Sequence, residues 1–319
     1  MKGEFCRLLT KDGIELHAFY VSPSGRRRKT TVVHVHGFAG NFYENRFIDY
    51  VAESLADQGV SFLTFNNRGH DYISDVLCER KKGSIVFRLC GGSYDTFTDC
   101  LEDIRAAADF AASRGATRII LQGHSYGAVK AAYYLSQITD PRIKGLILLS
   151  PSDTFGVQRR ALDERFPLGL EYAYERINRN HPEDFMLHGY FRYPMSAHTY
   201  ADMFDEESLA GIFNLSRTDR EEFPELAAIR LPVLAAVGTV EEYFLGTPEQ
   251  FLLDLQTQMK NAPSFTGYVA VGAPHNYLGH ETKLTRVISD WVSEQCEVRT
   301  PKYERRVRHS DFAPRRSDD

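Results

Sequence analysis

The stretch Gly123-His124-Ser125-Tyr126-Gly127 lies between two segments of different character. Residues 117–122 before it are apolar and β-branched, which predicts a buried strand. Residues 128–135 after it are typical of a helix. A turn this tight strains the backbone of its central residue, and the two glycines leave room where helix and strand approach each other. The sequence therefore predicts a nucleophile elbow, G-x-S-x-G, which holds the serine hydroxyl at the carboxyl edge of a sheet.

A second glycine-rich turn is expected upstream. Residues 31–35 are typical of a central strand and lead into His36-Gly37-Phe38-Ala39-Gly40. Such a loop can turn its backbone N–H groups inward, so the N–H groups of Phe38 and Tyr126 are the expected donors of an oxyanion hole. Gly37 belongs to this loop, and the His36 ring is expected to hold it by a hydrogen bond. His34-x-His36 has no carboxylate motif beside it at metal-ligand spacing, so we expect no metal.

Strand-like and helix-like segments alternate along most of the chain. A hairpin with an Asp-Gly turn is expected over 5–21. The pattern of 76–93 assigns no clear element, with loops expected at 81–84 and 91–93 around a short segment at 85–87. Helices are predicted at 43–58, 96–114, 247–259 and 281–296, and strands at 60–65, 143–150, 231–238 and 268–271. This order indicates an α/β fold with a mostly parallel central sheet flanked by helices.

In a parallel sheet the ligand lies beyond the carboxyl ends of the strands. The loops that should meet there are 36–40, 66–71, 123–127 and 151–153. His70 could line the site, but it is better explained as a brace that hydrogen-bonds within its own loop. His124, inside the elbow, is also assigned to loop support.

Residues 154–226 interrupt the alternation and are rich in charged and aromatic side chains. We expect them to form an inserted helical cap that walls a substrate cavity, with most aromatic rings in the cap's own core. Residues 1–153 and 227–296 would then form the core. Residues 297–319 are polar and basic, which predicts a disordered tail.

The composition limits the functional classes. The chain has 319 residues, of which 43% are hydrophobic and 25% charged, and a formal net charge of −5 that does not suggest a nucleic-acid partner. No apolar run is long enough to predict membrane insertion, and the first residues lack the apolar core of a secretion signal. Five scattered cysteines without a C-x-x-C pair indicate free thiols in a reducing cytoplasm. No cofactor motif is found, and the oligomeric state is left open, with a dimer as one option.

The order of chemical groups resembles the α/β-hydrolase superfamily over residues 5–296. The elbow serine comes first, an acidic residue follows a later strand, and Gly272-Ala273-Pro274-His275 follows the last strand. The chain looks most like capped esterases and lipases, with a fainter likeness to fungal siderophore-ester hydrolases around the elbow. The resemblance implies Ser125 as nucleophile and His275 as base, ahead of His280, which is expected at a helix start.

The acidic residue that the resemblance implies departs from the pattern that is common in the superfamily. The superfamily usually has Asp three residues after the glycine that ends the acid strand, and here that position is Glu241. Glutamate can also accept the histidine Nδ1–H and stabilise the imidazolium. Glu242 is adjacent, and Asp153 follows the preceding core strand, so both remain alternatives.

These residues predict a serine hydrolase that cleaves small carboxylic esters through an acyl-enzyme. An acyltransferase, thioesterase or cyclase could use the same triad with another acceptor, and a peptidase or carbon–carbon bond hydrolase also remains open. A ligand-binding protein that retains the fold without turnover is the alternative from another class.

Overall fold

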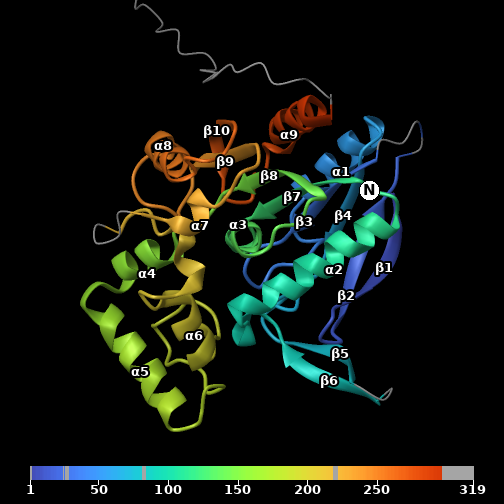
Figure 1. The fold of residues 1–319 in the computed structure, drawn as a ribbon. Coiled ribbons are helices and arrows are strands. Elements are labelled where there is room, and N and C mark those ends of the chain that lie inside the picture. Colours follow the sequence, from blue (N-terminus) through green and yellow to red (C-terminus); the bar gives the residue numbers. More distant parts are fainter. Residues whose placement is uncertain (1, 24, 26–28, 81–83, 218–221, 297–319) are drawn as a thin grey trace, which may run out of the picture.

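The structure is a computed structural model that describes residues 2–296 except 24, 26–28, 81–83 and 218–221 (Figure 1). The predicted tail, 297–319, lies outside the described residues. An eight-stranded sheet forms the centre, in the order β1-β2-β4-β3-β7-β8-β9-β10. Its strands are β1 (Glu4–Leu9), β2 (Glu15–Val21), β3 (Thr30–Val35), β4 (Ser61–Phe65), β7 (Arg118–His124), β8 (Ile143–Leu149), β9 (Val233–Val240) and β10 (Phe265–Pro274).

Six of these strands, from β4 to β10 in the sheet order, run parallel, and β1 and β2 form the antiparallel hairpin expected at the start. Every residue of β3 is buried, as its β-branched content requires of a strand covered on both faces. In the hairpin burial mostly alternates, with Ile14, Leu16 and Ala18 on the buried face, until Tyr20 and Val21 are both buried at the end of β2. The predicted α/β fold with a mostly parallel sheet is therefore confirmed.

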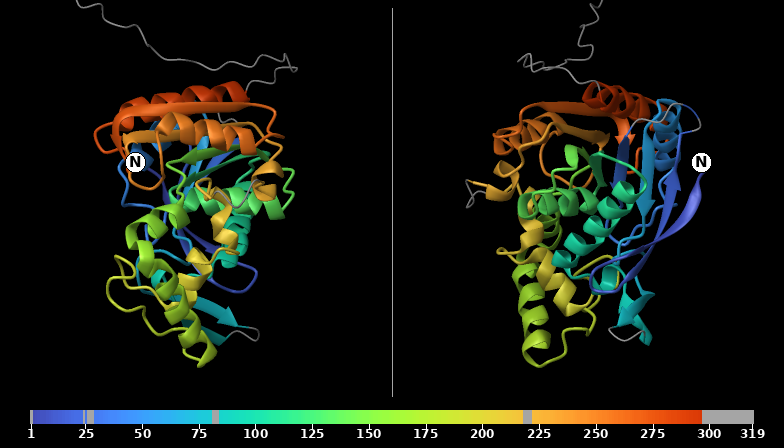
Figure 2. Two further views of the ribbon diagram at one scale, coloured as in Figure 1. Left: turned by 90° about the vertical axis from the view of Figure 1, so that its left-hand side faces the viewer. Right: turned by 45° about the vertical axis from the view of Figure 1, so that its right-hand side comes forward.

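Helices cover both faces of the sheet, as the two views of Figure 2 show. On one face α1 (Phe47–Asp57) packs against α9 (Glu281–Cys296), and on the other lie α2 (Cys100–Ser113), α3 (Tyr126–Gln137) and α8 (Pro248–Gln258). Helix α1 begins four residues later than predicted, and a 3-10 turn at Phe97–Asp99 precedes α2. Helix α8 is capped at its N-terminus by Thr247, whose hydroxyl accepts the Gln250 N–H at 3.2 Å.

The short segment expected at 85–87 is part of a longer strand that the sequence did not reveal, and of the loop expected at 81–84, residues 81–83 lie outside the described residues. Strands β5 (Ser74–Arg80) and β6 (Ser84–Cys90) pair into an antiparallel ribbon that projects from the body below β1 and β2 (Figure 1). Ile85 and Phe87, one residue apart on β6, are 68% and 69% exposed. The side chains of Ile85 and Phe87 thus do not face a core. The alternation of buried and exposed residues by which a strand is usually recognised in a sequence is therefore missing here.

The segment between β8 and β9 holds the predicted insertion, residues 154–226. Its helices are α4 (Thr154–Leu162), η3 (Asp163–Arg165), α5 (Phe166–Asn178), α6 (Ala197–Phe204) and η4 (Leu209–Phe213), and a short α7 (Pro224–Ala227) leads back to the sheet. Several of its aromatic side chains are fully buried, including those of Phe155, Tyr200, Phe204 and Phe213. The division into a core and a cap at these boundaries stays a prediction. Among the described residues, no helix is both long and apolar enough to cross a membrane.

Candidate active site

Ser125 occupies the sharp turn between β7 and α3 with φ of 57° and ψ of −127°. A Cβ on Gly123 would overlap the carbonyl oxygen of Gly127, and a Cβ on Gly127 would overlap the carbonyl oxygen of Val35. The Ser125 N–H donates to the carbonyl of Leu149 at 2.8 Å. The two glycines therefore permit a close approach of helix and strand that holds the serine in a backbone region rarely adopted by other residues.

The loop after β3 packs directly against this serine. A Cβ on Gly37 would lie 2.9 Å from the Ser125 Cβ and 3.4 Å from its Oγ. Phe38 is the next residue, and its N–H has no acceptor among the described residues. Tyr126 is the first residue of α3, so its N–H lacks an intrahelical acceptor. Two backbone donors thus flank the serine from different elements.

The His36 ring joins two of the strand-end loops. Its Nε2 accepts the Asn67 N–H at 3.0 Å, so its Nδ1 carries the proton and donates to the Gly37 carbonyl at 2.8 Å. Burial lowers the pKa of His36 to about 3, so the ring is neutral near pH 7. His70 makes a similar brace within its own loop, donating from Nδ1 to the Asn67 carbonyl at 3.0 Å.

His275 and Glu241 meet at the same edge of the sheet. Glu241 directly follows β9, and its side chain is 1% exposed. The His275 Nδ1 hydrogen-bonds to the carboxylate of Glu241. With Nδ1 protonated, Nε2 is the nitrogen left to accept a proton.

The competing residues are engaged elsewhere. Asp153 caps α4, where its carboxylate accepts the Gly156 N–H at 2.9 Å and the Ser216 N–H at 3.2 Å. Glu242 is exposed and hydrogen-bonds to Tyr243. His280 lies just before α9, with its ring against Gly272. Of the three candidate acids, the structure brings only Glu241 to the His275 ring.

The backbone of His275 is held by His124, which was expected to support a loop, and by Ser150 and Tyr277, whose contribution the sequence did not reveal. The His124 Nε2–H donates to the His275 carbonyl at 2.9 Å, and the Ser150 hydroxyl lies 3.2 Å from the same oxygen. Tyr277 accepts from Ser150 at 3.0 Å and donates to the Ala236 carbonyl at 2.8 Å. Burial lowers the pKa of His124 to about 3, which keeps its ring neutral. The elbow, the end of β8 and the histidine loop are thereby tied together.

Ser152 is a further neighbour that sequence reasoning missed. Its Oγ lies 3.3 Å from the Ser125 Oγ. Within the part of the chain that the structure describes, no hydrogen bond joins Ser125 to the His275 ring. Hydrogen bonds between catalytic groups are often long without substrate and tighten in the complex. Ser152 follows β8 by three residues, and only the folded arrangement of β7 and β8 brings its hydroxyl to the elbow.

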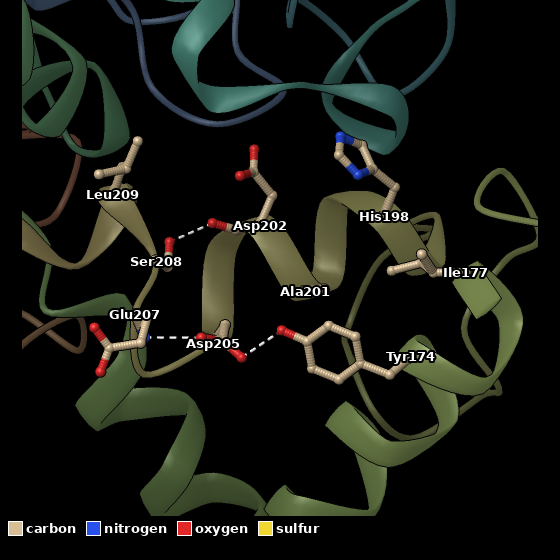
Figure 3. Close-up of a pocket in the computed structure, with 9 residues that line it drawn as sticks. All are labelled: Tyr174, Ile177, His198, Ala201, Asp202, Asp205, Glu207, Ser208 and Leu209. Carbon is tan, nitrogen blue, oxygen red and sulfur yellow. Dashed lines mark hydrogen bonds between the residues drawn. The ribbon is translucent and has the colours of Figure 1, made fainter.

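A separate pocket lies between α5 and α6 (Figure 3). Its volume is about 280 Å³, and its lining includes Tyr174, His198, Asp202 and Asp205. Asp205 accepts hydrogen bonds from the Tyr174 hydroxyl and from the Glu207 N–H, as drawn in Figure 3. None of the residues at the elbow, the oxyanion loop or the histidine loop lines it, so it is distinct from the Ser125 site.

A strained serine on an elbow, with a histidine–carboxylate pair at the same sheet edge, is the arrangement of hydrolases built on a parallel α/β sheet. A family model described as "alpha/beta hydrolase fold" matches residues 30–196, just over half of the chain. The chain belongs to this family, so the resemblance seen in the sequence is confirmed.

Comparison with solved structures gives the same fold. Est1E from Butyrivibrio proteoclasticus, solved with ferulic acid bound, superposes with a TM-score of 0.62 at 22% identity, covering 91% of this chain and 98% of that one. The esterase Pf2001 from Pyrococcus furiosus gives a TM-score of 0.58 at 16% identity, covering 93% of both chains. An α/β serine hydrolase homologue from Coxiella burnetii gives 0.52 at 16% identity, covering 92% of this chain and 98% of that one. A search of curated protein sequences finds no match.

Proposed function

We propose that this protein hydrolyses carboxylic esters of small molecules through an acyl-enzyme on Ser125. The observation that carries the proposal is the hydrogen bond between Glu241 and His275 Nδ1, beside a serine held at positive φ. That bond orients the ring and leaves Nε2 as the base, which are the two tasks of a triad acid. Esterases among the structural neighbours are consistent with this activity.

The reaction follows from the positions of the groups. His275 Nε2 takes the proton of the Ser125 hydroxyl as Oγ bonds to the ester carbonyl carbon, and Glu241 stabilises the imidazolium. The Phe38 and Tyr126 N–H groups receive the oxyanion. The carbon–oxygen bond to the alcohol then breaks, and the alcohol leaves with the proton from His275. Water then attacks the acyl carbon as His275 takes its proton. The bond between that carbon and Ser125 Oγ breaks, Oγ regains the proton from His275, and the acid is released.

Ser152 fits the resting state of this scheme. Its hydroxyl, 3.3 Å from the Ser125 Oγ, offers that oxygen a partner when no substrate is bound. Attack requires Ser125 to turn its proton toward His275, so the contact with Ser152 must be released or rearranged first. A Ser152→Ala variant should therefore retain turnover, unlike variants of Ser125.

The test is labelling with a fluorophosphonate probe followed by mapping of the modified peptide. We expect modification at Ser125, loss of it in Ser125→Ala and His275→Ala, and turnover of a simple ester such as 4-nitrophenyl acetate. Ser113→Ala, which changes an exposed serine at the end of α2, is the matched control and should behave as wild type. Ester turnover that persists in folded Ser125→Ala would refute the proposal.

The same assay tests whether water or an alcohol accepts the acyl group from Ser125. If an alcohol replaces water, adding it should yield a new ester at the expense of free acid. Release of acid that is unchanged by a competing alcohol favours hydrolysis over acyl transfer. Folded protein that binds an ester without cleaving it would instead support the binding-protein alternative.

A further inference from the structure

A cap segment of three consecutive residues, Phe191-Arg192-Tyr193, reaches across to the loops of the active site. The Phe191 ring packs 5.8 Å from that of Phe38, which belongs to the loop that packs against the serine. The Tyr193 ring lies 4.8 Å from that of Tyr72, which follows the loop after β4. These rings are partly exposed, although those of Phe38 and Phe191 also pack against the core, so part of each ring is available to a ligand.

The other flank of the site carries a ring as well. Tyr243 packs with its centroid 4.2 Å from that of the His275 ring. Burial, the neighbouring Glu242 and the nearness of Tyr193 raise the pKa of Tyr243 to about 12, while Arg192 acts to lower it. Arg192 and Tyr193 therefore lie near Tyr243 as well as near Tyr72, and their segment extends between the oxyanion side and the histidine side of the site.

This segment is held in place by the residues that follow it. The Ser93 hydroxyl donates to the Pro194 carbonyl at 2.7 Å, and the Ser196 N–H donates to the Ser93 carbonyl at 2.9 Å. Thr199 of α6 donates its hydroxyl toward the carbonyls of Ser93 and Asp95, 3.1 Å from each. A surface anchored in this way loses little conformational entropy when a ligand binds to it.

Arg192 supplies the positive charge of this surface. It is exposed, its guanidinium carbon lies 5.2 Å from the Tyr193 ring centroid, and within the described residues it forms no ion pair. Glu44 lies near Tyr72 and Glu242 near Tyr243, so the flanks on either side are acidic. An anionic group on a ligand is thus attracted to Arg192 and repelled by Glu44 and Glu242 on either side. This arrangement favours one orientation of the ligand.

We propose that the Ser125 site selects esters that carry an aromatic ring with an acidic substituent, the ring packing on Tyr72 and Tyr193 and the acid binding Arg192. Aromatic rings contribute stacking and apolar contact, and a guanidinium binds a carboxylate through charge-assisted hydrogen bonds. The inference rests on the proposed ester hydrolysis and specifies its substrate class. The ring can belong to the acyl part or to the leaving alcohol, and the two are separated by experiment.

The test compares kcat/KM for two matched sets of esters. The acyl set is methyl cyclohexanecarboxylate, methyl benzoate and methyl 4-carboxybenzoate. The alcohol set is cyclohexyl acetate, phenyl acetate and 4-acetoxybenzoate. In one set, the wild-type enzyme should prefer the aromatic ester, and Arg192→Gln should lower the preference for its carboxylate-bearing member about fivefold, as expected for one solvent-accessible charged contact. Comparing the ratio between variants cancels the intrinsic reactivity of each ester.

Further variants separate the ring from the charge. Tyr193→Leu should lower the aromatic preference and leave the effect of the carboxylate in place, and Arg192→Lys should retain part of that effect. Arg179→Gln changes an exposed arginine after α5 that pairs with Glu175, and it should match wild type.

The outcomes are distinct. A carboxylate ratio that Arg192→Gln leaves unchanged in both sets, or no cleavage of any aromatic ester by enzyme that turns over 4-nitrophenyl acetate, overturns the substrate class while the ester hydrolysis stands. Turnover independent of Ser125 overturns the proposed function itself.

Discussion

A buried ion pair beneath the elbow gives a sharp test of how α3 is held. Lys130, one turn into α3, and Asp95, just before α2, are 3% and 4% exposed at their side chains, and Lys130 Nζ lies 2.6 Å from Asp95 Oδ2. The other carboxylate oxygen, Oδ1, has no hydrogen-bond partner within the described residues. Burial acts to lower the pKa of Lys130, but Asp95 outweighs it and raises that pKa. The carboxylate thus depends on this one cation.

The decisive change is Lys130→Met, which preserves the length of the side chain and removes its charge. Removing one partner of a buried pair leaves the other charge uncompensated, at a cost of about 3–5 kcal/mol in the free energy of unfolding. With a urea m-value of about 3 kcal/mol/M, the unfolding midpoint should fall by about 1–2 M. The double variant Lys130→Met/Asp95→Asn removes both charges and should recover much of the loss.

Equilibrium urea unfolding measures both effects. The single tryptophan, Trp291 of α9, is buried and reports on the far face of the sheet, while far-UV circular dichroism reports on the helices. Coincident transitions justify a two-state treatment. A loss under about 1 kcal/mol in Lys130→Met, or no recovery in the double variant, would show that the Asp95 carboxylate is not desolvated as the structure has it.

Three further results are expected. Glu241→Gln should lower kcat for ester hydrolysis by about 10²–10⁴-fold at unchanged Tm, because the amide can turn its NH₂ to His275 and favour the wrong tautomer; a loss under tenfold would remove Glu241 from the triad. The free energy of unfolding should fall as the pH drops from about 6.5 toward 3. His36 and His124 have pKa values of about 3 in the folded protein, below the ordinary 6.5, so over this range only the unfolded chain binds their protons. Each of the two residues should lower the free energy of unfolding by up to about 1.4 kcal/mol per pH unit. His36→Asn should flatten that slope in acid unfolding, and an unaltered slope would contradict the assignment. Tyr277→Phe should cost about 0.5–1.5 kcal/mol in thermal unfolding, because it removes one of two hydrogen bonds to the buried Ala236 carbonyl, which keeps the Ser150 N–H as donor; a Tm equal to that of wild type would contradict this.

The sequence predicts the elbow and the strands around it because steric demands act locally there. Gly123 and Gly127 are required by contacts within a few residues or with the neighbouring strand, and β3 and β4 are buried at every residue, which agrees with the β-branched or apolar residues that predicted them. Glu241 is one of three acids that the sequence offers as partner of His275, because the side chains of adjacent residues in a loop differ in the direction in which they point, and the sequence does not give that direction. Direction depends on how β9 ends against β10, which spacing does not encode.

Other features could not be predicted because they join distant parts of the chain. Ser152 reaches Ser125 only through the register of β7 and β8, and His124 finds the His275 carbonyl 151 residues away. The β5–β6 ribbon was missed for the opposite reason. Most residues of β6, including Ile85 and Phe87, are exposed, so the strand lacks the alternation of buried and exposed residues that usually reveals a strand in the sequence.

The place of the insertion in the sheet bears on how such a protein can change over time. The chain leaves the sheet after β8 and returns at β9, and these two strands are neighbours, with Leu148 paired to Ala235. The entry and exit of the segment are therefore fixed by the sheet, whatever lies between them. Helices can be lengthened, exchanged or lost there without shifting the residues of the elbow. Arg192 and Tyr193 of the proposed substrate surface lie in this segment, whereas the candidate triad lies outside it, so replacing one continuous segment could alter the proposed selectivity while keeping the proposed chemistry.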